Sequence, residues 1–408
     1  MLRLRDRLAR PRAGTMLAAA VLAAVSLAAA ACDGPSPAGG SAAGAAAAAA
    51  GSAAASAVQA GAVSASSSAR ASAPASARAT LPAHPAPARP AAAGGTTVPG
   101  APGCPLFPAD NVWNTDISAL PVAPQSAAWL ASMDAAGTDL HPDFGPDPGG
   151  YPYGIPVTVV SASHPLAAVS FTYADESDRG PYPFGADTLI EGGPQAGGDR
   201  HAIMVKAGTC ELYELWNARY AAGGASAGSG ATWNLRSDAL RPSGWTSADA
   251  AGLPVLPGLL SYAQVQAAVA AGKPVTHAIR FTADATQSAF IWPARHAAGS
   301  GSGPGLPPMG ARFRLAASFS VAGFCAPAVP YCADARAILV EMQHYGLILA
   351  DNGSNWYFQG SAFPQWPDGL ISLLKGIPAR AFQAVSESCL MVSPHSGQAT
   401  AKPGCPIG

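Results

Sequence analysis

One segment restricts where this chain can fold: residues 33 to about 103 consist almost entirely of Ala, Ser, Pro and Gly. Such a segment has almost no large apolar side chain, so it cannot bury enough surface to offset the entropy lost on ordering. We therefore expect a disordered tether there. The remaining residues, 104–408, are long enough for one large globular domain, and no second linker interrupts them.

The residues before the tether are typical of a secretory signal. Residues 1–13 are rich in Arg, and the apolar run MLAAAVLAAVSLAAAAC follows. The run is too short and too rich in Ala for a membrane span of about 20 residues, which favours a signal peptide over residues 1–31. Its final Cys32 resembles the lipidated Cys of bacterial lipoproteins, although Ala29 stands where Leu is commonest. We expect lipidation at Cys32 and a tether over 32–103; the alternative is cleavage after an A-x-A-like site and free secretion.

Composition restricts the possible partners. The chain has 23 Lys and Arg against 24 Asp and Glu, so it is nearly neutral and carries no basic stripe for nucleic acid. We expect an exported protein of the bacterial cell envelope or the extracellular space, which meets the membrane only through its lipid anchor.

Cysteine usage also indicates export. Without Cys32 six cysteines remain, and an even number in an exported chain favours three disulfides. Cys325 and Cys332 are close enough in sequence to close a small loop. The other four allow three pairings, of which we favour Cys104–Cys210 and Cys389–Cys405. No Cys or His has zinc-site spacing.

Short runs rich in Val, Ile, Phe, Tyr and Thr, bounded by Gly, Pro and Asp, predict a mainly β domain. An antiparallel sandwich or a jelly-roll-like pair of sheets, with a few short peripheral helices, is the simplest arrangement. Helical spacing and stop signals predict helices near 126–137, 261–272 and 333–346 and a last short one in DGLISLLKG. Asn352-Gly353, between two apolar runs, predicts a β-hairpin.

A second hairpin is predicted in GDRHAIMVKAGTCELYELWN, residues 198–217. A turn in KAGT places His201 opposite Glu214. Alternation then places His201, Ile203 and Val205 on the same face as Glu214, Leu212 and Cys210. One interpretation is a structural ion pair at a sheet rim. The other is a cleft in which a carboxylate transfers protons.

The functional interpretation favours glycoside hydrolysis, which needs two carboxylates at a groove. The candidate catalytic residues are Glu214, Glu191, His201 and Asp199. Aromatic rings offer flat apolar faces to sugars, and polar groups on the ADNGSNWY segment could line the same groove. The candidate substrate-binding residues are Trp216, Trp356, Asn352, Asn355 and Asp351.

Other polar clusters are less specific. Asp175, Glu176 and Asp178 could hold a structural Ca²⁺ but lack EF-hand spacing, and a solvated turn is the alternative. His296 precedes a Gly-rich loop, where it could be a ligand or a base. Ser226 in GASAG matches G-x-S-x-G but lacks the helix that a nucleophile elbow requires. We expect no cofactor.

The segments LHPDFG, GDRHAIMV, CELYEL and ADNGSNWY resemble those of a family of secreted bacterial proteins of uncharacterised activity. The resemblance covers most of residues 104–390 and implies one unit, but no reaction. From the residues alone we expect an exported hydrolase of a polysaccharide or cell-wall glycan. A non-catalytic surface glycan-binding protein is the alternative, and a metal-assisted hydrolase that uses Asp175, Asp178 and His201 is a third possibility.

Overall fold

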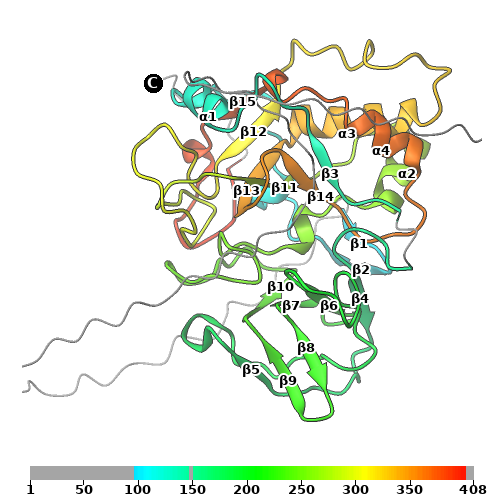
Figure 1. The fold of residues 1–408 in the computed structure, drawn as a ribbon, viewed down its shortest axis with the longest axis vertical. Helices are drawn as coiled ribbons and strands as arrows, with labels where there is room; N and C mark the ends of the chain where they lie inside the picture. The colour runs from blue at the N-terminus through cyan, green and yellow to red at the C-terminus, as the bar shows by residue number, and fades with distance from the viewer. Residues whose placement is uncertain (1–95, 147–149, 401–408) are drawn as a thin grey trace, which may run out of the picture. The chain divides into compact units, whose positions relative to one another are not determined.

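The computed structural model describes residues 96–146 and 150–400, and this part is mostly sheet with four α-helices (Figure 1). The predicted signal peptide, Cys32 and most of the tether lie outside the described residues. Within them, no helix is long and apolar enough to cross a membrane.

A six-stranded sheet forms the larger part of the fold, with the strand order β15-β12-β13-β11-β14-β3. It is a mixed sheet, because β11 runs parallel to β13 and β14 runs parallel to β3. The purely antiparallel arrangement expected from the sequence is therefore not what this sheet adopts. Its strands are β3 (His141–Asp143), β11 (Ile279–Ala283), β12 (Arg312–Leu315), β13 (Leu347–Asn352), β14 (Tyr357–Gln359) and β15 (Phe382–Val385).

The Asn352-Gly353 hairpin prediction is wrong. Strands β13 and β14 flank this dipeptide in sequence, but β11 lies between them in the sheet. The chain therefore crosses over β11 instead of turning back on itself. A local turn signal cannot anticipate a strand inserted from residues 279–283, because that pairing is non-local.

A four-stranded sheet, of order β10-β7-β6-β4, contains the second predicted hairpin. One face of β6 and β7 joins the main hydrophobic core, and the other face joins a smaller core beneath it. A three-stranded sheet, β5-β9-β8, covers that smaller core (Figure 1). These strands are β4 (Val157–Val160), β5 (Val169–Phe171), β6 (Ala202–Lys206), β7 (Glu211–Trp216), β8 (Arg219–Ala221), β9 (Gly224–Ala227) and β10 (Ser229–Asn234).

The helices are peripheral, as predicted. They are α1 (Ser126–Ser132), α2 (Tyr262–Ala271), α3 (Cys332–His344) and α4 (Asp368–Leu374). Helix α3 packs against α2, α4 and β12, while α1 packs against β15. Helix α2 ends where Gly272 takes a φ of 61°, which a residue without a Cβ adopts readily.

Two of the predicted disulfides are present, Cys104–Cys210 and Cys325–Cys332. The first joins the short strand β2 (Ala101–Pro105), which pairs with β1 (Thr97–Val98), to the turn between β6 and β7. The predicted pairing of Cys389 with Cys405 cannot be followed, because Cys405 lies outside the described residues. Disulfides of this kind are compatible with export.

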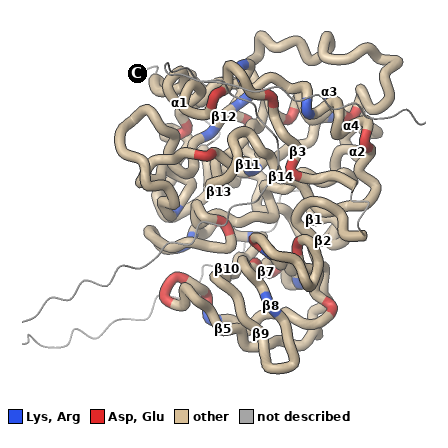
Figure 2. The backbone as a smooth tube through the Cα atoms, viewed as in Figure 1, with Lys and Arg blue, Asp and Glu red and all other residues tan. Residues whose placement is uncertain are grey.

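Charged residues are sparse and are mostly scattered singly among the elements (Figure 2). Several of them are nevertheless buried, among them Arg280, Arg312, Asp249 and Glu214. A buried charge is costly unless specific partners compensate it. The partners of these groups therefore indicate which of them are structural and which belong to a site.

Candidate functional site

The β6–β7 hairpin is present, but its register differs from the predicted one by two residues. Ile203, not His201, pairs with Glu214, and Lys206 pairs with Glu211. The loop consists of residues 207–210, one position later than the four-residue loop expected from the sequence, and Cys210, joined to Cys104, takes a φ of 59° inside it. A shift of two residues leaves each side chain on its predicted face.

Glu214 is a structural residue of the interior. Its side chain is 0% exposed. Its two carboxylate oxygens accept hydrogen bonds of 2.8–3.0 Å from the backbone N–H groups of Val255 and Leu256, where a 3-10 turn begins. Burial raises the pKa of Glu214 to about 7, although these hydrogen bonds act in the opposite direction. The open catalytic cleft predicted around Glu214 is therefore not found.

His201 and Glu191 form a partly buried ion pair. The ring Nδ1 of His201 lies 2.7 Å from Glu191 Oε2, and its Nε2 lies 3.1 Å from the carbonyl oxygen of Ala248. Burial opposes a charge on the ring, but the adjacent carboxylate outweighs it and raises the pKa of His201 to about 9. With an acceptor at each nitrogen, the ring is a doubly protonated donor near neutral pH and not a base.

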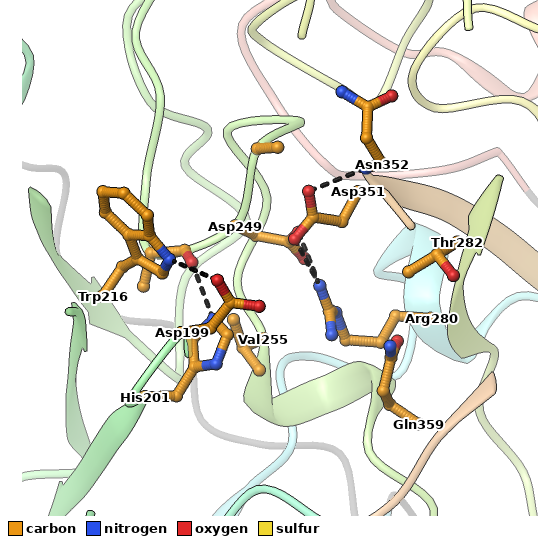
Figure 3. Close-up of polar contacts among 12 residues, drawn as sticks. Asp199, His201, Trp216, Asp249, Val255, Arg280, Thr282, Asp351, Asn352 and Gln359 are labelled. Atoms are coloured by element: carbon orange, nitrogen blue, oxygen red, sulfur yellow. Dashed lines mark hydrogen bonds and ion pairs between the residues drawn. The ribbon is translucent and has the colours of Figure 1, made fainter. Parts of the chain in front are cut away.

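Asp199, at the open end of the hairpin, lies in an accessible pocket of about 340 Å³. Its Oδ1 accepts a hydrogen bond of 3.0 Å from the indole Nε1 of Trp216 (Figure 3). The ring of Tyr173 lies 6.3 Å from that of Trp216, so two aromatic side chains form one wall. Asp199 and Trp216, both candidates from the sequence, thus lie together at this pocket, and both are accessible.

The opposite wall carries Asp351, whose side chain is 24% exposed. Burial and the nearby negative charge of Asp249 raise the pKa of Asp351 to about 7, against the lowering effect of Arg280. The negative charge of Asp199, on the other wall of the pocket, adds to this rise in the pKa of Asp351.

Arg280 supports this wall from behind. Its Nε and Nη2 lie 2.9 Å and 2.7 Å from the two carboxylate oxygens of Asp249, and Nη2 lies 3.6 Å from Asp351 Oδ2 (Figure 3). Arg280 is 2% exposed and Asp249 is 0% exposed. The guanidinium thus forms a bidentate ion pair with Asp249 and a longer contact with Asp351.

Trp356 is not a sugar-binding surface. Its side chain is 0% exposed, lies in the main core 5.6 Å from the ring of Phe281, and donates from Nε1 to the carbonyl oxygen of Met133. The indole points inward because the predicted Asn352-Gly353 hairpin does not form: β14 packs beside β11 instead of pairing with β13. Asn352 does line the pocket, whereas Asn355 accepts a hydrogen bond from the backbone of Asp284 outside it.

Two of the residues proposed for a cation site, Asp178 and Glu176, bind other protein groups, although Glu176 also lines the pocket. Asp178 Oδ2 lies 2.6 Å from Arg241 Nη1, and Glu176 accepts from the backbone of Thr246. Asp175, Asp178 and His201 do not line the pocket. In residues 96–146 and 150–400, no group of three or more His, Cys, Asp or Glu side chains is arranged to hold a metal ion.

Three further residues lie at the pocket or directly behind it. His296, which was a weak candidate, lines the pocket and bonds through Nδ1 to the carbonyl oxygen of Ala250 at 2.8 Å. Asp249 and Arg280 were missed. A signal for Arg280 existed, because a lone Arg within the apolar strand segment THAIRFTA requires a buried acidic partner.

The role assigned to Glu214 predicts how the variant Glu214→Gln behaves. The pKa of Glu214 rises from 4.5 to about 7 on folding, so the folded protein holds this proton more tightly than the unfolded chain. The free energy of unfolding therefore falls as the pH rises from about 4.5 to about 7, and this group accounts for about 3 kcal/mol of the decrease. Gln has no proton to lose but keeps one acceptor oxygen, so the variant loses this part of the pH dependence.

Urea unfolding at about pH 5 and about pH 8 measures the effect. Glu387 and Asp351, whose pKa values are also raised to about 7, keep their own share of the pH dependence in both proteins. An unchanged pH dependence in the variant would contradict the assignment.

Comparison with protein-family models, curated proteins and solved structures finds no match to this chain. The resemblance to secreted bacterial proteins therefore stays a prediction, and the function is argued from the site alone.

Proposed function

We propose that this protein is an exported, lipid-anchored hydrolase of a polysaccharide or cell-wall glycan, with Asp351 and Asp199 as its carboxylate pair. The observation that carries the proposal is that both carboxylates lie on one accessible pocket, beside the indole of Trp216. A glycosidase needs two carboxylates in different protonation states and a surface for a sugar ring. The pair differs from Glu214 and Glu191, which the sequence favoured.

The two carboxylates have different environments and therefore different roles. Asp351, whose pKa is raised to about 7, is the proton donor to the glycosidic oxygen. The C–O bond then breaks, and its electron pair passes to that oxygen. Asp199, held by Trp216, stabilises the positive charge that develops at the anomeric carbon. Water adds to this carbon, and the carboxylate pair takes up the proton that the water loses.

Trp216 and Tyr173 supply the sugar-binding wall in this proposal. Their rings lie on the accessible side of the pocket, whereas Trp356 lies in the core. The same two rings would also serve a non-catalytic glycan-binding protein, which is the alternative. The presence of a second, partly protonated carboxylate favours catalysis, because binding alone does not need one.

The pH profile tests the assignment of Asp351. Because the donor must be protonated, kcat/KM is expected to fall as pH rises through about 7, with its decrease set by Asp351. Release of reducing ends from a panel of polysaccharides, measured between about pH 5 and about pH 9, gives this profile. A rate that still rises above neutral pH would refute Asp351 as the acid. Binding of a glycan without any release of reducing ends would favour the non-catalytic alternative.

A further inference from the structure

A second pocket adjoins the first at Asp199. It has a volume of about 540 Å³, and its walls come from the segments around Tyr151–Gly154 and Glu191–Asp199. Asp199 lines both pockets, so the proposed catalytic carboxylate stands between two hollows. Each hollow lies in the range of about 300–1,000 Å³ that is usual for ligand sites.

The second pocket also presents aromatic rings to the solvent. Tyr151 is 50% exposed and Tyr153 is 45% exposed. The Tyr153 hydroxyl donates to Asp143, which fixes its ring. The ring of Tyr151 lies against the backbone at Gly193, where a Cβ would approach it to 2.7 Å. The pocket thus has two supported rings that can contact a sugar.

The charge of the side chains that line the two pockets favours uncharged glycans over anionic ones. Their ionisable walls consist of Glu176, Glu191, Asp199, Asp249 and Asp351, together with His296. In the described part of the chain, neither wall includes a Lys or Arg side chain, and Arg280 is bound behind Asp249. Glu191 is paired with His201 and Asp249 with Arg280, which leaves Glu176, Asp199 and Asp351 as the carboxylates on the walls. A chain of uronate or sulfate groups would meet these carboxylates with no Lys or Arg side chain on either wall.

We infer that one glycan chain without carboxylate or sulfate groups lies through both pockets, with sugars on each side of Asp199, and that it is cut internally. This inference rests on the proposed function, and it adds the polymer class, the second binding pocket and the position of the cut. An enzyme that removed sugars from a chain end would need a wall that closes one side of the catalytic carboxylate. Here a second hollow with exposed rings lies on that side.

Native electrophoresis in gels that contain a polysaccharide tests the binding without relying on catalysis. The gels contain matched polymers that differ in charge: hydroxyethyl and carboxymethyl cellulose, methyl-esterified pectin and polygalacturonate, dextran and dextran sulfate. We expect retardation by at least one neutral polymer, and at least about tenfold weaker retardation by its anionic counterpart. Equal or stronger retardation by the anionic polymers, or no retardation in any gel, would overturn the inference.

Four variants distinguish the contributions of the two pockets to binding. Tyr151→Ala is expected to weaken retardation by the neutral polymer about tenfold. Tyr151→Phe keeps the aromatic ring and is expected to be retarded like the wild type. Tyr220→Ala removes a tyrosine of similar exposure, 46%, outside both pockets and serves as the control. If Trp216→Ala weakens binding and Tyr151→Ala does not, the second pocket is refuted and the proposed function stands. If Trp216→Ala has no effect, the proposed function itself fails.

The products report the position of the cut. Internal cleavage lowers the viscosity of the retained polymer early and yields a range of oligosaccharide lengths. Release of only mono- or disaccharides, with the polymer length preserved, would overturn internal cleavage but leave the hydrolase proposal intact.

Discussion

Replacing Asp351 by Asn is expected to lower kcat on a hydrolysed glycan by about 10²–10⁴-fold without unfolding the protein. Asn has nearly the same shape but has no proton to give to the glycosidic oxygen. Because Asp351 is 24% exposed and sits on the pocket wall, the substitution disturbs no core packing. Reducing-end assays of the folded variant measure the loss, and thermal unfolding verifies the fold.

A matched substitution provides the control for Asp351→Asn. Asp187→Asn changes a carboxylate that is 68% exposed and lies outside the pocket, so its activity should equal that of the wild type. Asp199→Asn should lose activity to a similar extent as Asp351→Asn. If Asp351→Asn and Asp199→Asn both keep wild-type rates, the carboxylate pair is wrongly assigned and glycan binding without catalysis becomes the better proposal.

Replacing Arg280 by Met is expected to lower the free energy of unfolding by about 3–5 kcal/mol, because it leaves the carboxylate of Asp249 buried without its counter-charge. Arg280 donates through two nitrogens to that carboxylate, and both side chains are shielded from water. Urea unfolding measures the loss. Arg219→Met, at an exposed Arg, should change stability by no more than about 0.5 kcal/mol.

The same variant has a second consequence at the pocket. Arg280 lowers the pKa of Asp351, so its removal should move the alkaline decrease of kcat/KM to higher pH. The double variant Arg280→Met with Asp249→Leu removes both charges and should recover much of the lost stability. A double variant no more stable than Arg280→Met would show that packing, and not the unpaired charge, causes the loss.

The local features of the fold were predictable from the sequence. Helical spacing and a following Gly marked α2 and α3, and two-residue alternation placed Leu212 and Glu214 on the same face of β7. Both signals depend only on residues a few positions apart. Side-chain faces survived even a register error of two residues, because they depend on whether the shift is odd or even.

The functional roles could not be assigned in the same way. Asp199 and Trp216 were candidates because they lie on one hairpin, and the structure does bring them together. Glu214 was favoured as a catalytic residue because a carboxylate can transfer protons. Its carboxylate instead accepts hydrogen bonds from the backbone N–H groups of Val255 and Leu256, about forty positions further along the chain. No residue near Glu214 in the sequence indicates that its carboxylate accepts these two backbone hydrogen bonds. Its role was therefore decided by burial and not by its residue type.

By itself, the sequence determined that a small-residue segment precedes a β-rich domain, which face each hairpin side chain takes, and that Cys104 and Cys210 could be joined. Only the tertiary structure decided that Asp199, Asp249, Arg280 and Asp351 meet at one place. The reason is physical: β11 enters the sheet between β13 and β14, and this non-local pairing brings Arg280 beside Asp351 and directs Trp356 into the core. Local propensities cannot encode a contact whose partners are far apart along the chain.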